Sequence, residues 1–527
     1  MPVSTLTDST TGAAAVGDDR LDTVELNVSI LNNAGPGYDF QNFSDSTLIV
    51  DGTVASVNDE GVISDAGGTN NEIIVSEAGI VTGETGIEIN DSDGSVINSG
   101  MIQGSERGLY VTGSGERFKL VNTGIIVAST IYDDVDGDTQ GRAIQIDVDF
   151  ASISNSGLIS GSNLGLDINA DHVAITNSGT IEATGPIGTT ISDGSGFVIN
   201  HSGADFALVN TGEILGNVAY GVATNAFSAT GNGAIIENSG TIYALDQALR
   251  VVGQDGLTPN IINSGTIHSD GSAMYLDGDF AIFDVANSGD VAGEFGLFVV
   301  FAGLDLDNSG TITGFGGIAI NTNGGALDDA IVSTGQILGD VELGDGVDSY
   351  ILVGPGVTTG NVSLGDGDDL AIGAEAADVI SGGNDADFIS GGGGADVLAG
   401  DAGADIVLGG AGTDTISGGE GVDFLLGEEG ADVFIFTSVS ESPTGGDVTS
   451  ILDFERGEDI IDLYSITLGI QFIGGDAFSG TGTAEVQTAE IGGVLTVVSF
   501  DSDGNGASDM EIIVYGAVDM DRADFGL

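Results

Sequence analysis

The chain has 527 residues, and its 81 Asp and Glu residues against 8 Lys and Arg residues give a formal net charge of −73 at pH 7. This charge excludes nucleic-acid binding by phosphate neutralisation, which needs Lys and Arg, and it makes anionic membranes and polyanions poor partners. It favours divalent cations instead. Because 41% of the residues are apolar, we expect a packed fold rather than a disordered chain.

The composition predicts an all-β protein. Glycine accounts for 90 residues, and short Val, Ile and Leu runs alternate with Gly, Asn, Asp and Ser, which is the pattern of strands and tight turns. The absence of Cys excludes disulfides and thiolate metal sites. The sequence has no run of 18 apolar residues, so we expect no membrane-spanning helix.

Residues 1–24 are expected to form an N-terminal tail or cap. They contain neither the basic region nor the apolar region of a Sec-type signal peptide. We therefore expect that an export signal, which a secreted protein needs, lies elsewhere in the chain.

Residues 25–342 contain a five-residue motif, Asn-Ser/Thr-Gly-x-Ile/Val, at intervals of 21–33 residues. It begins at Asn98, Asn122, Asn155, Asn177, Asn210, Asn238, Asn263, Asn287 and Asn308, with a variant at Ser333. Looser copies are predicted at Asp59 and Glu77. A repeat of this length without helical segments predicts one coil of a right-handed parallel β-helix per interval.

Each residue of the motif is expected to occupy the same corner in every coil. Coils stack about 4.8 Å apart, so the Asn amides can form an internal hydrogen-bonded ladder. The Gly is expected to supply a corner with positive φ, and the final Ile or Val is expected to point into the core. The pattern resembles the stalks of bacterial adhesins and autotransporter passengers, which implies an architectural role for these residues.

Residues 343–436 contain a nine-residue repeat, which runs in tandem from Leu364 to Ile435 and has an outlying copy at Leu343. Its sixth position is always Asp, at Asp348, Asp369, Asp378, Asp387, Asp396, Asp405, Asp414, Asp423 and Asp432. Its eighth position is usually a large apolar residue, which we expect to form a thin core.

Two nine-residue units are expected to close one turn of a flattened roll, so that successive Asp residues alternate between two edges. On each edge the carboxylates would lie about one strand spacing, or 4.8 Å, apart. Such a row of negative charge requires cations. Calcium fits best, because it takes about 6–8 oxygen ligands, including backbone carbonyls that glycine turns expose.

The nine-residue unit resembles the RTX (hemolysin-type) nonapeptide GGxGxDxUx. The resemblance implies a parallel β-roll that binds several Ca²⁺ ions through its Asp residues. Two units depart from the pattern, because Ala374 and Ala376 replace glycines in the first and Asp385 replaces the fourth-position glycine in the next. We expect those two turns to bind calcium weakly, if they bind it.

Residues 437–527 are predicted to form a small β-rich C-terminal cap. The run from Asp447 to Leu463 resembles the block that follows the repeats in RTX metalloproteases and other type I-secreted proteins. The end, from Asp524 to Leu527, resembles the uncleaved export signal of that family. The resemblance implies export to the outside of the cell by the type I secretion apparatus, without an N-terminal signal peptide.

A different kind of calcium site is predicted within the cap, in a loop with the spacing of an EF-hand at positions 1, 3, 5 and 9. Its ligands would be Asp501, Asp503, Asn505 and Asp509. The twelfth position is Ile512 rather than an acidic residue, so an Asp/Gly-rich hairpin turn is the alternative. A weaker version of the pattern is present at Asp134, Asp136 and Asp138.

These patterns predict a secreted, calcium-dependent structural protein of a Gram-negative bacterium, as a component of a surface layer, an extracellular matrix or an adhesin. Besides calcium, the expected partners are further copies of the chain or a cell-surface glycan or lipopolysaccharide. The alternative is a secreted carbohydrate-active enzyme, because the arrangement also resembles the mannuronan epimerases. We assign no catalytic residue, since neither their Asp-Pro-His motif nor the His-Glu-x-x-His motif of metalloproteases is present.

Overall fold

The computed structural model describes most of the chain. It covers residues 3–6, 13–14, 21–24, 29–33, 35–40, 44–64, 68–90, 93–113, 117–129, 141–184, 197–221, 234–253, 258–278, 281–322, 325–446 and 448–527. These residues form β-strands, joined by turns, and two short 3₁₀ helices, η2 (Val439–Glu441) and η3 (Arg522–Asp524). No helix in the described part of the chain is long and apolar enough to cross a membrane. The prediction of an all-β fold is confirmed.

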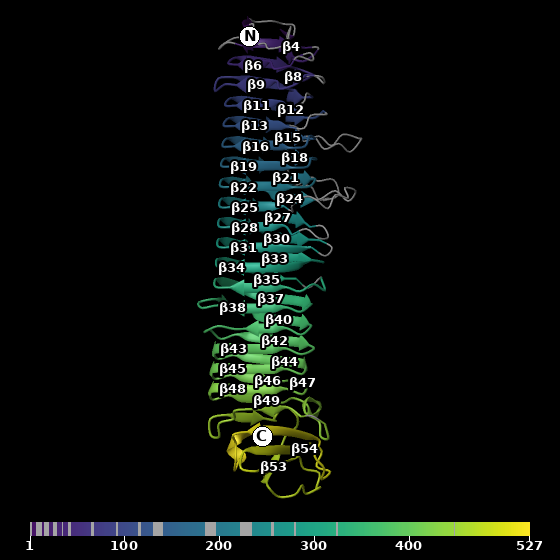
Figure 1. The fold of residues 1–527 in the computed structure, drawn as a ribbon, viewed down its shortest axis with the longest axis vertical. Helices are drawn as coiled ribbons and strands as arrows, with labels where there is room; N and C mark the ends of the chain where they lie inside the picture. Colours follow the sequence, from purple (N-terminus) through teal and green to yellow (C-terminus); the bar gives the residue numbers. More distant parts are fainter. Residues whose placement is uncertain are drawn as a thin grey trace. The chain divides into compact units, whose positions relative to one another are not determined.

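The chain divides into two compact units, residues 1–293 and residues 294–527 (Figure 1). In unit 1 the strands form two parallel sheets, A1 and B1. Sheet A1 contains β1 (Val3–Leu6), β3 (Leu21–Val24), β6 (Thr47–Val50), β9 (Glu72–Val75), β11 (Ser95–Asn98), β13 (Phe118–Asn122), β16 (Ala151–Asn155), β19 (Val173–Asn177), β22 (Phe206–Asn210), β25 (Ile235–Asn238), β28 (Asn260–Asn263) and β31 (Ile282–Asn287). Sheet B1 contains β2 (Ala13–Ala14), β4 (Ser29–Asn32), β5 (Tyr38–Asp39), β7 (Thr53–Ser56), β8 (Val62–Ser64), β10 (Ile80–Ile89), β12 (Met101–Val111), β14 (Ile125–Ala128), β15 (Arg142–Ile146), β17 (Leu158–Gly161), β18 (Leu164–Ile168), β20 (Thr180–Ala183), β21 (Phe197–Ser202), β23 (Glu213–Leu215), β24 (Asn217–Gly221), β26 (Thr241–Ala244), β27 (Gln247–Val252), β29 (Thr266–Ser269), β30 (Ser272–Asp277) and β32 (Asp290–Gly293).

The Asn residues of the five-residue motif form a buried ladder in unit 1. Each side-chain Nδ2 donates to the Oδ1 of the Asn one coil further along, from Asn98 through to Asn287, at 2.7–2.9 Å. In unit 2 the Nδ2 of Asn308 donates to the hydroxyl of Ser333 at 3.0 Å. The Ile or Val that ends the motif is buried in the core, as at Ile102. The predicted parallel β-helix and its ladder are confirmed.

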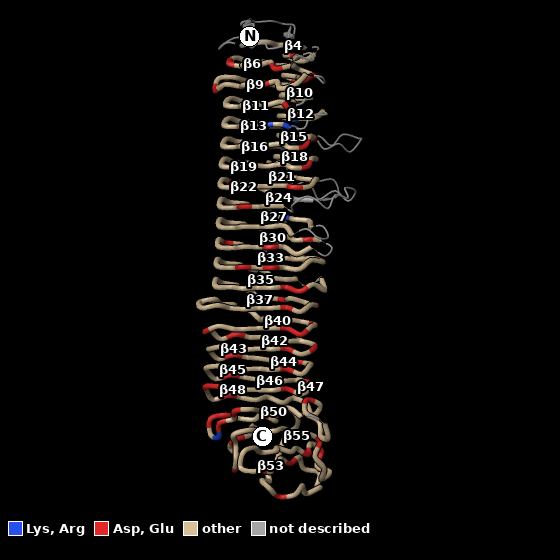
Figure 2. Tube along the Cα trace, in the orientation of Figure 1, with Lys and Arg blue, Asp and Glu red and all other residues tan. Residues whose placement is uncertain are grey.

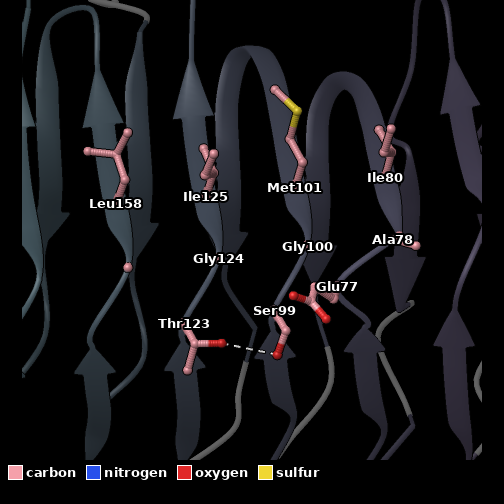
Figure 3. Close-up of a pocket in the computed structure, with 12 residues that line it drawn as sticks. Glu77, Ala78, Ile80, Ser99, Gly100, Met101, Thr123, Gly124, Ile125 and Leu158 are labelled. Carbon is pink, nitrogen blue, oxygen red and sulfur yellow. Dashed lines mark hydrogen bonds between the residues drawn. The ribbon is translucent and has the colours of Figure 1, made fainter.

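The expected role of the motif glycine is wrong. Gly100, Gly124 and Gly157 are not among the residues with positive φ. They lie directly against the backbone of the neighbouring coil, and a Cβ on Gly124 would collide with the carbonyl oxygen of Gly100 (Figure 3). Glycine is needed here because stacked coils approach too closely for any side chain.

Of the two looser copies of the motif, the one predicted at Asp59 is also wrong. Gly79, the third residue of the copy at Glu77, stacks beside Gly100 as a motif glycine should. The copy at Asp59 instead leads into β8, which pairs with the second half of β10, at Ile87–Ile89. It therefore belongs to a different corner of the coil, where a glycine also turns the chain.

Unit 2 likewise contains two sheets, A2 and B2, in which the strands before the cap are parallel (Figure 1). Sheet A2 contains β34 (Gly303–Asn308), β36 (Ala330–Ser333), β38 (Ser349–Leu352), β41 (Leu370–Ile372), β43 (Phe388–Gly394), β45 (Ile406–Gly412), β48 (Phe424–Gly430), β50 (Ser450–Ile451), β52 (Gln471–Gly474), β53 (Glu485–Ile491), β54 (Leu495–Asp501) and β55 (Met510–Tyr515). Sheet B2 contains β33 (Phe295–Val300), β35 (Thr311–Asn321), β37 (Gln336–Asp345), β39 (Val357–Thr358), β40 (Asn361–Asp366), β42 (Val379–Asn384), β44 (Val397–Gly403), β46 (Thr415–Ser417), β47 (Glu420–Gly421), β49 (Val433–Ile435), β51 (Ile460–Asp462) and β56 (Phe525–Gly526).

The nine-residue units form a β-roll in which residue i pairs with residue i+18, as Phe388 pairs with Ile406. The eighth-position side chains are at most 1% exposed and fill the space between the sheets, as predicted. Strands β43, β44, β45 and β48 are seven residues long, because ladder pairing continues into the turn, where Gly392 pairs with Gly410.

The C-terminal residues cap the roll within unit 2. Strand β50 pairs with β48 and β55, and β51 pairs with β49 and β56, so the cap adds strands to both sheets. Strands β53, β54 and β55 pair antiparallel. Arg456 ties this cap together, because its guanidinium lies 3.2 Å from carboxylate oxygens of both Asp521 and Asp524. The predicted β-rich cap is confirmed.

Candidate calcium-binding edges of the roll

The sixth-position Asp residues are at most 4% exposed, and each immediately precedes a strand of the roll. The edge of sheet A2 carries Asp348, Asp369, Asp387, Asp405 and Asp423, and the edge of sheet B2 carries Asp378, Asp396, Asp414 and Asp432. Figure 2 shows the acidic residues at the ends of these strands. The nine-residue period thus places successive Asp residues on alternating edges.

Within each edge, every carboxylate except that of Asp378 is held by the backbone of the preceding coil. The N–H of Asp378 donates to Oδ1 of Asp396 at 2.8 Å, and that of Asp396 donates to Oδ1 of Asp414 at 2.9 Å. The second oxygen, Oδ2, is buried without a hydrogen-bond partner in seven residues of the described chain. They are Asp348, Asp369, Asp387, Asp396, Asp405, Asp414 and Asp432. Buried oxygens are seldom left unpaired, so these atoms call for a ligand.

The first-position glycines leave room beside these oxygens. A Cβ on Gly409 would lie 2.5 Å from Oδ2 of Asp414 and 2.8 Å from the carbonyl oxygen of Gly427. A carboxylate oxygen and a backbone carbonyl oxygen therefore converge on a space that only glycine leaves open. Oxygen donors alone, charged and neutral, are the set that Ca²⁺ prefers, so the residues present fit this ion.

Burial makes the edge carboxyls weak acids. It raises the pKa of Asp348 and of Asp387 to about 7, and that of Asp396 to about 6, with further increases from neighbouring carboxylates. The backbone N–H bond to each carboxylate acts in the opposite direction but is outweighed. Ionised carboxylates at these positions therefore destabilise the fold, and a bound cation would remove this destabilisation.

The unit at 373–381 has a different turn. Neither Ala374 nor Ala376 is among the residues with positive φ, whereas Gly392 and Gly394, the corresponding residues of the next unit on the same edge, have φ of 92° and 133°. The N–H of Ala374 donates to Oδ2 of Asp378 at 3.2 Å and so engages the oxygen that is free elsewhere. By contrast, Asp385 adopts the left-handed conformation that the missing glycine would take, with φ of 75°.

Sequence reasoning missed residues that extend both edges. The N–H of Asp329 donates to Oδ1 of Asp348 at 2.7 Å, and the N–H of Asp432 donates to Oδ1 of Asp459 at 3.0 Å. Both added Asp residues are buried. Each is followed two residues later by a buried Ile, as in the regular units, and this Asp-x-Ile spacing is the signal that could have found them.

One edge ends at a hydroxyl group. The N–H of Asp423 lies 3.4 Å from the hydroxyl oxygen of Thr449, which occupies the position where the next Asp would stand. The same hydroxyl donates to Oδ2 of Asp423 at 3.1 Å. The last carboxylate on the A2 edge is therefore satisfied by a neutral donor.

The predicted loop in the cap brings its acidic residues together. The four expected ligands are Asp501, Asp503, Asn505 and Asp509. The three carboxylates each place an oxygen within 4.8 Å of the others. Asp501 is buried, and its two oxygens accept the N–H groups of Gly504 and Gly506 at 2.7 Å. These bonds close the loop as a turn, so calcium binding here stays a prediction. The weaker pattern at residues 134–138 lies outside the described residues.

The histidines of unit 1 are engaged by their own neighbours. Nδ1 of His172 lies 2.7 Å from a carboxylate oxygen of Asp205, and His268 stacks on Tyr243. His201 is buried, and burial lowers its pKa to about 4. Such a histidine is neutral near pH 7 and structural in character. The enzymatic alternative stays a prediction.

A shallow groove of about 560 Å³ lies along the motif corner in unit 1 (Figure 3). Ile80, Met101, Ile125 and Leu158 form one wall, the motif glycines form the floor, and Ser99 and Thr123 lie on the other side. Glu77 is the one titratable residue in its lining. The groove therefore offers no pair of acid and base for catalysis.

A comparison with protein-family models identifies the repeats. Residues 364–398 and 399–434 each match the model of the RTX calcium-binding nonapeptide repeat in its four-copy form. Residues 364–434 are RTX calcium-binding repeats. RTX nonapeptide repeats bind Ca²⁺ ions, which agrees with the oxygen-lined edges. The RTX match begins after Asp348, so the outlying unit and the extensions at Asp329 and Asp459 lie beyond it.

Two solved structures are similar to part of the chain. The AlgE6R3 subunit of the mannuronan C5-epimerase from Azotobacter vinelandii has 29% sequence identity over 29% of this chain and 80% of that chain, with a TM-score of 0.15. The AlgE6R2 subunit of the same enzyme has 25% identity over 31% of this chain and 91% of that chain, with a TM-score of 0.16. No curated protein matches the chain.

Proposed function

We propose that this protein is a secreted structural protein whose RTX roll folds when it meets calcium outside the cell. The observation that carries the proposal is the row of seven buried Oδ2 atoms without partners on the two edges of the roll. Without a cation, folding would bring these carboxylates together in a buried environment. With calcium between them, the binding free energy becomes folding free energy.

The sixth-position Asp residues have two tasks in this proposal. Oδ1 accepts a backbone N–H and fixes the carboxylate, and Oδ2 serves as the ligand, together with carbonyl oxygens of the glycine turns. Asp378 and Asp423 would contribute least, because their Oδ2 atoms already accept hydrogen bonds. We therefore propose about seven strong sites, one for each unpaired Oδ2, and a weaker one at the Asp501 loop.

We propose four functional segments. Residues 1–24 are a tail or cap, 25–342 a β-helical spacer, 343–436 the calcium-binding roll, and 437–527 the cap with the export signal. In the cytoplasm calcium is scarce, and the repulsion among the Asp residues would keep the C-terminal region unfolded and exportable. The type I secretion apparatus would then deliver it to a surface layer, an extracellular matrix or an adhesin, where other copies or surface glycans are its partners.

A calcium titration of the whole chain tests this proposal. Circular dichroism should show a large gain of β-structure between chelator and millimolar calcium, and equilibrium dialysis should give about seven tightly bound ions. Magnesium is the control, since it holds its water more strongly and needs a stricter geometry. Equal β-content in chelator and in calcium would overturn the proposal. Turnover of a uronate or neutral glycan that is lost on mutating one carboxylate or histidine would favour the enzymatic alternative instead.

A further inference from the structure

The outer surface of sheet A2 changes character in the roll. Two columns of side chains point outward there, from the seventh and ninth positions of each unit. Ten large apolar residues in and beside these columns form what we call the apolar face. They are Val332, Ile351, Leu370, Ile372, Phe388, Ile406, Leu408, Phe424, Leu426 and Leu452.

The apolar face is exposed and is the more apolar of the two outer faces of the roll. Phe388 is 37% exposed, Ile406 39% and Phe424 45%. In sheet B2 the ninth-position column consists mainly of small residues, at Ser363, Ser381, Ala399 and Ser417, with Ile435 as the exception. The outer surface of sheet A1 is mixed. Ser152, Ser154, Ala174 and Thr176 are small or polar, whereas Ile235, Ile262 and Ile282 are exposed beside Glu237, Asn260 and Asp284. Sheet B2 also exposes Val379, Val397 and Ile460. In the A2 part of the roll, however, both outward columns carry large apolar side chains and neither contains a charged residue.

The size of the apolar face exceeds an ordinary surface feature. It spans seven coils, which at about 4.8 Å per coil is roughly 30 Å. A whole large apolar side chain has roughly 150–200 Å² of surface, so ten of them at this exposure present on the order of 500 Å². A contiguous apolar patch of this size usually marks an interaction surface.

We propose that the apolar face is the contact between two copies of this chain, which pair face to face through their calcium-loaded rolls. This proposal rests on the proposed calcium-dependent folding, because sheet A2 exists only in the folded roll. Two such faces would bury on the order of 1,000 Å² in total, which is the lower limit for a specific interface. The dimer should therefore be weak, with a dissociation constant of about micromolar.

The charges around the apolar face favour a second copy over a membrane. Between β36 and β50 the described residues of its columns are apolar or are Ala and Ser, so pairing sets no like charges opposite one another. No Lys or Arg is present between Arg250 and Arg456, so the surface lacks the basic residues that help a protein to bind a membrane.

Sedimentation velocity of the whole chain over a concentration series tests the dimer. In millimolar calcium the weight-average mass should rise from 52.5 kDa towards twice that value, and in chelator it should not. The test variant combines Phe388→Thr with Phe424→Thr, since hydroxyl residues already occupy the seventh position at Ser349 and Thr415. It should weaken association about tenfold or more.

The matched control combines Val379→Thr with Val397→Thr, which are 42% and 47% exposed at the seventh position of sheet B2. It should associate like the wild type. If the first variant does not fold, Leu408→Ser with Leu426→Ser tests the same face, because Ser390 occupies that column naturally.

Three outcomes would overturn the dimer: a wild type that folds in calcium and remains monomeric, association that survives in both face variants, or a monomeric wild type that uses this face to bind phosphatidylcholine vesicles. Circular dichroism on the same samples separates this failure from that of the proposed function. If calcium induces β-structure but the protein stays monomeric, only the dimer proposal is contradicted. If calcium induces no β-structure, the folding proposal is contradicted.

Discussion

Asp396 shows how a single carboxylate can serve both the fold and a cation. Its Oδ1 accepts the N–H of Asp378, as a backbone acceptor would, and its Oδ2 is buried without a partner. The first bond contributes to the fold in either state. The second oxygen destabilises the calcium-free roll and stabilises the roll once an ion is bound. The net contribution of Asp396 to stability should therefore change sign between the two conditions.

Replacement of Asp396 by Asn should therefore act in opposite directions. Asn keeps the Oδ1 acceptor but removes the charge. In millimolar calcium, we expect the free energy of unfolding to fall by about 2–4 kcal/mol, the scale of one lost tight site. In chelator, we expect it to rise by about 1 kcal/mol, because a buried charge is gone. Urea unfolding in calcium measures the first change, and the osmolyte concentration needed to fold the roll in chelator measures the second. The exposed Asp305→Asn is the control. Equal losses in both conditions would contradict the ligand role.

The raised pKa values predict how the calcium-free roll responds to pH. The folded state holds the pKa of Asp387 at about 7 and that of Asp396 at about 6, above the ordinary value of 3.8. Their stabilising contribution is thus fully present below about pH 4 and is lost as the pH rises through 6–7.

Thermal unfolding in chelator should accordingly show a less stable roll at about pH 8 than at about pH 5, and calcium should reverse this order, since its ligands must be ionised. General charge repulsion has the same sign in chelator, so the slope should be compared with that of the double variant Asp387→Asn, Asp396→Asn. An unchanged slope in the variant would show that these two carboxyls are not responsible.

At the scale of the elements, the parts that could be predicted are those that repeat by translation. The recurring Asn motif marks the same corner of each coil, which predicts the ladder that begins at Asn98, and the constant period of nine predicts the alternating Asp edges. Asp329 and Asp459 could not be predicted because they lie 19 and 27 residues from their neighbours on the edge, instead of the regular 18. The role of Gly124 could not be predicted, because close approach between coils is a property of packing. The apolar face could not be predicted either, because the sequence of an apolar strand does not show which of its two sides is covered.

The first-position glycine of a repeat is predicted to be more sensitive than the third. Gly409→Ala would place a Cβ 2.5 Å from Oδ2 of Asp414, in the space between the converging oxygens. We expect a loss of about 1–3 kcal/mol in calcium, together with one fewer bound ion. Gly393→Ala is the matched control, because its nearest atom would be 3.6 Å away and Ala411 occupies the same position in the next unit on that edge. Equal calcium stoichiometry in both variants would contradict the proposed position of the site.

At the scale of the whole molecule, the two units are stabilised differently. Unit 1 contains the neutral Asn ladder and a continuous apolar core, with its polar amides satisfied inside the protein. Unit 2 contains the roll, where the charged edges await a ligand. Unfolding should therefore not be a single two-state transition when calcium is removed.

Hydrogen exchange can locate this difference. In chelator, we expect amides of the roll at residues 343–436 to exchange rapidly, while those of the Asn-ladder strands, such as β16 and β19, remain protected. In calcium, both sets should be protected. Magnesium in place of calcium is the control, and uniform protection throughout the chain in chelator would contradict a separate, calcium-dependent roll.

The Asn ladder of unit 1 also has a direction. Every amide from Asn98 to Asn263 donates towards the higher-numbered coil, so the amide dipoles align head to tail along the stack. Aligned amides polarise one another and strengthen the bonds between them. A single reversed amide would set two donors against each other on one side and two acceptors on the other. The amide orientation in one coil therefore fixes the amide orientation in all the coils stacked upon it.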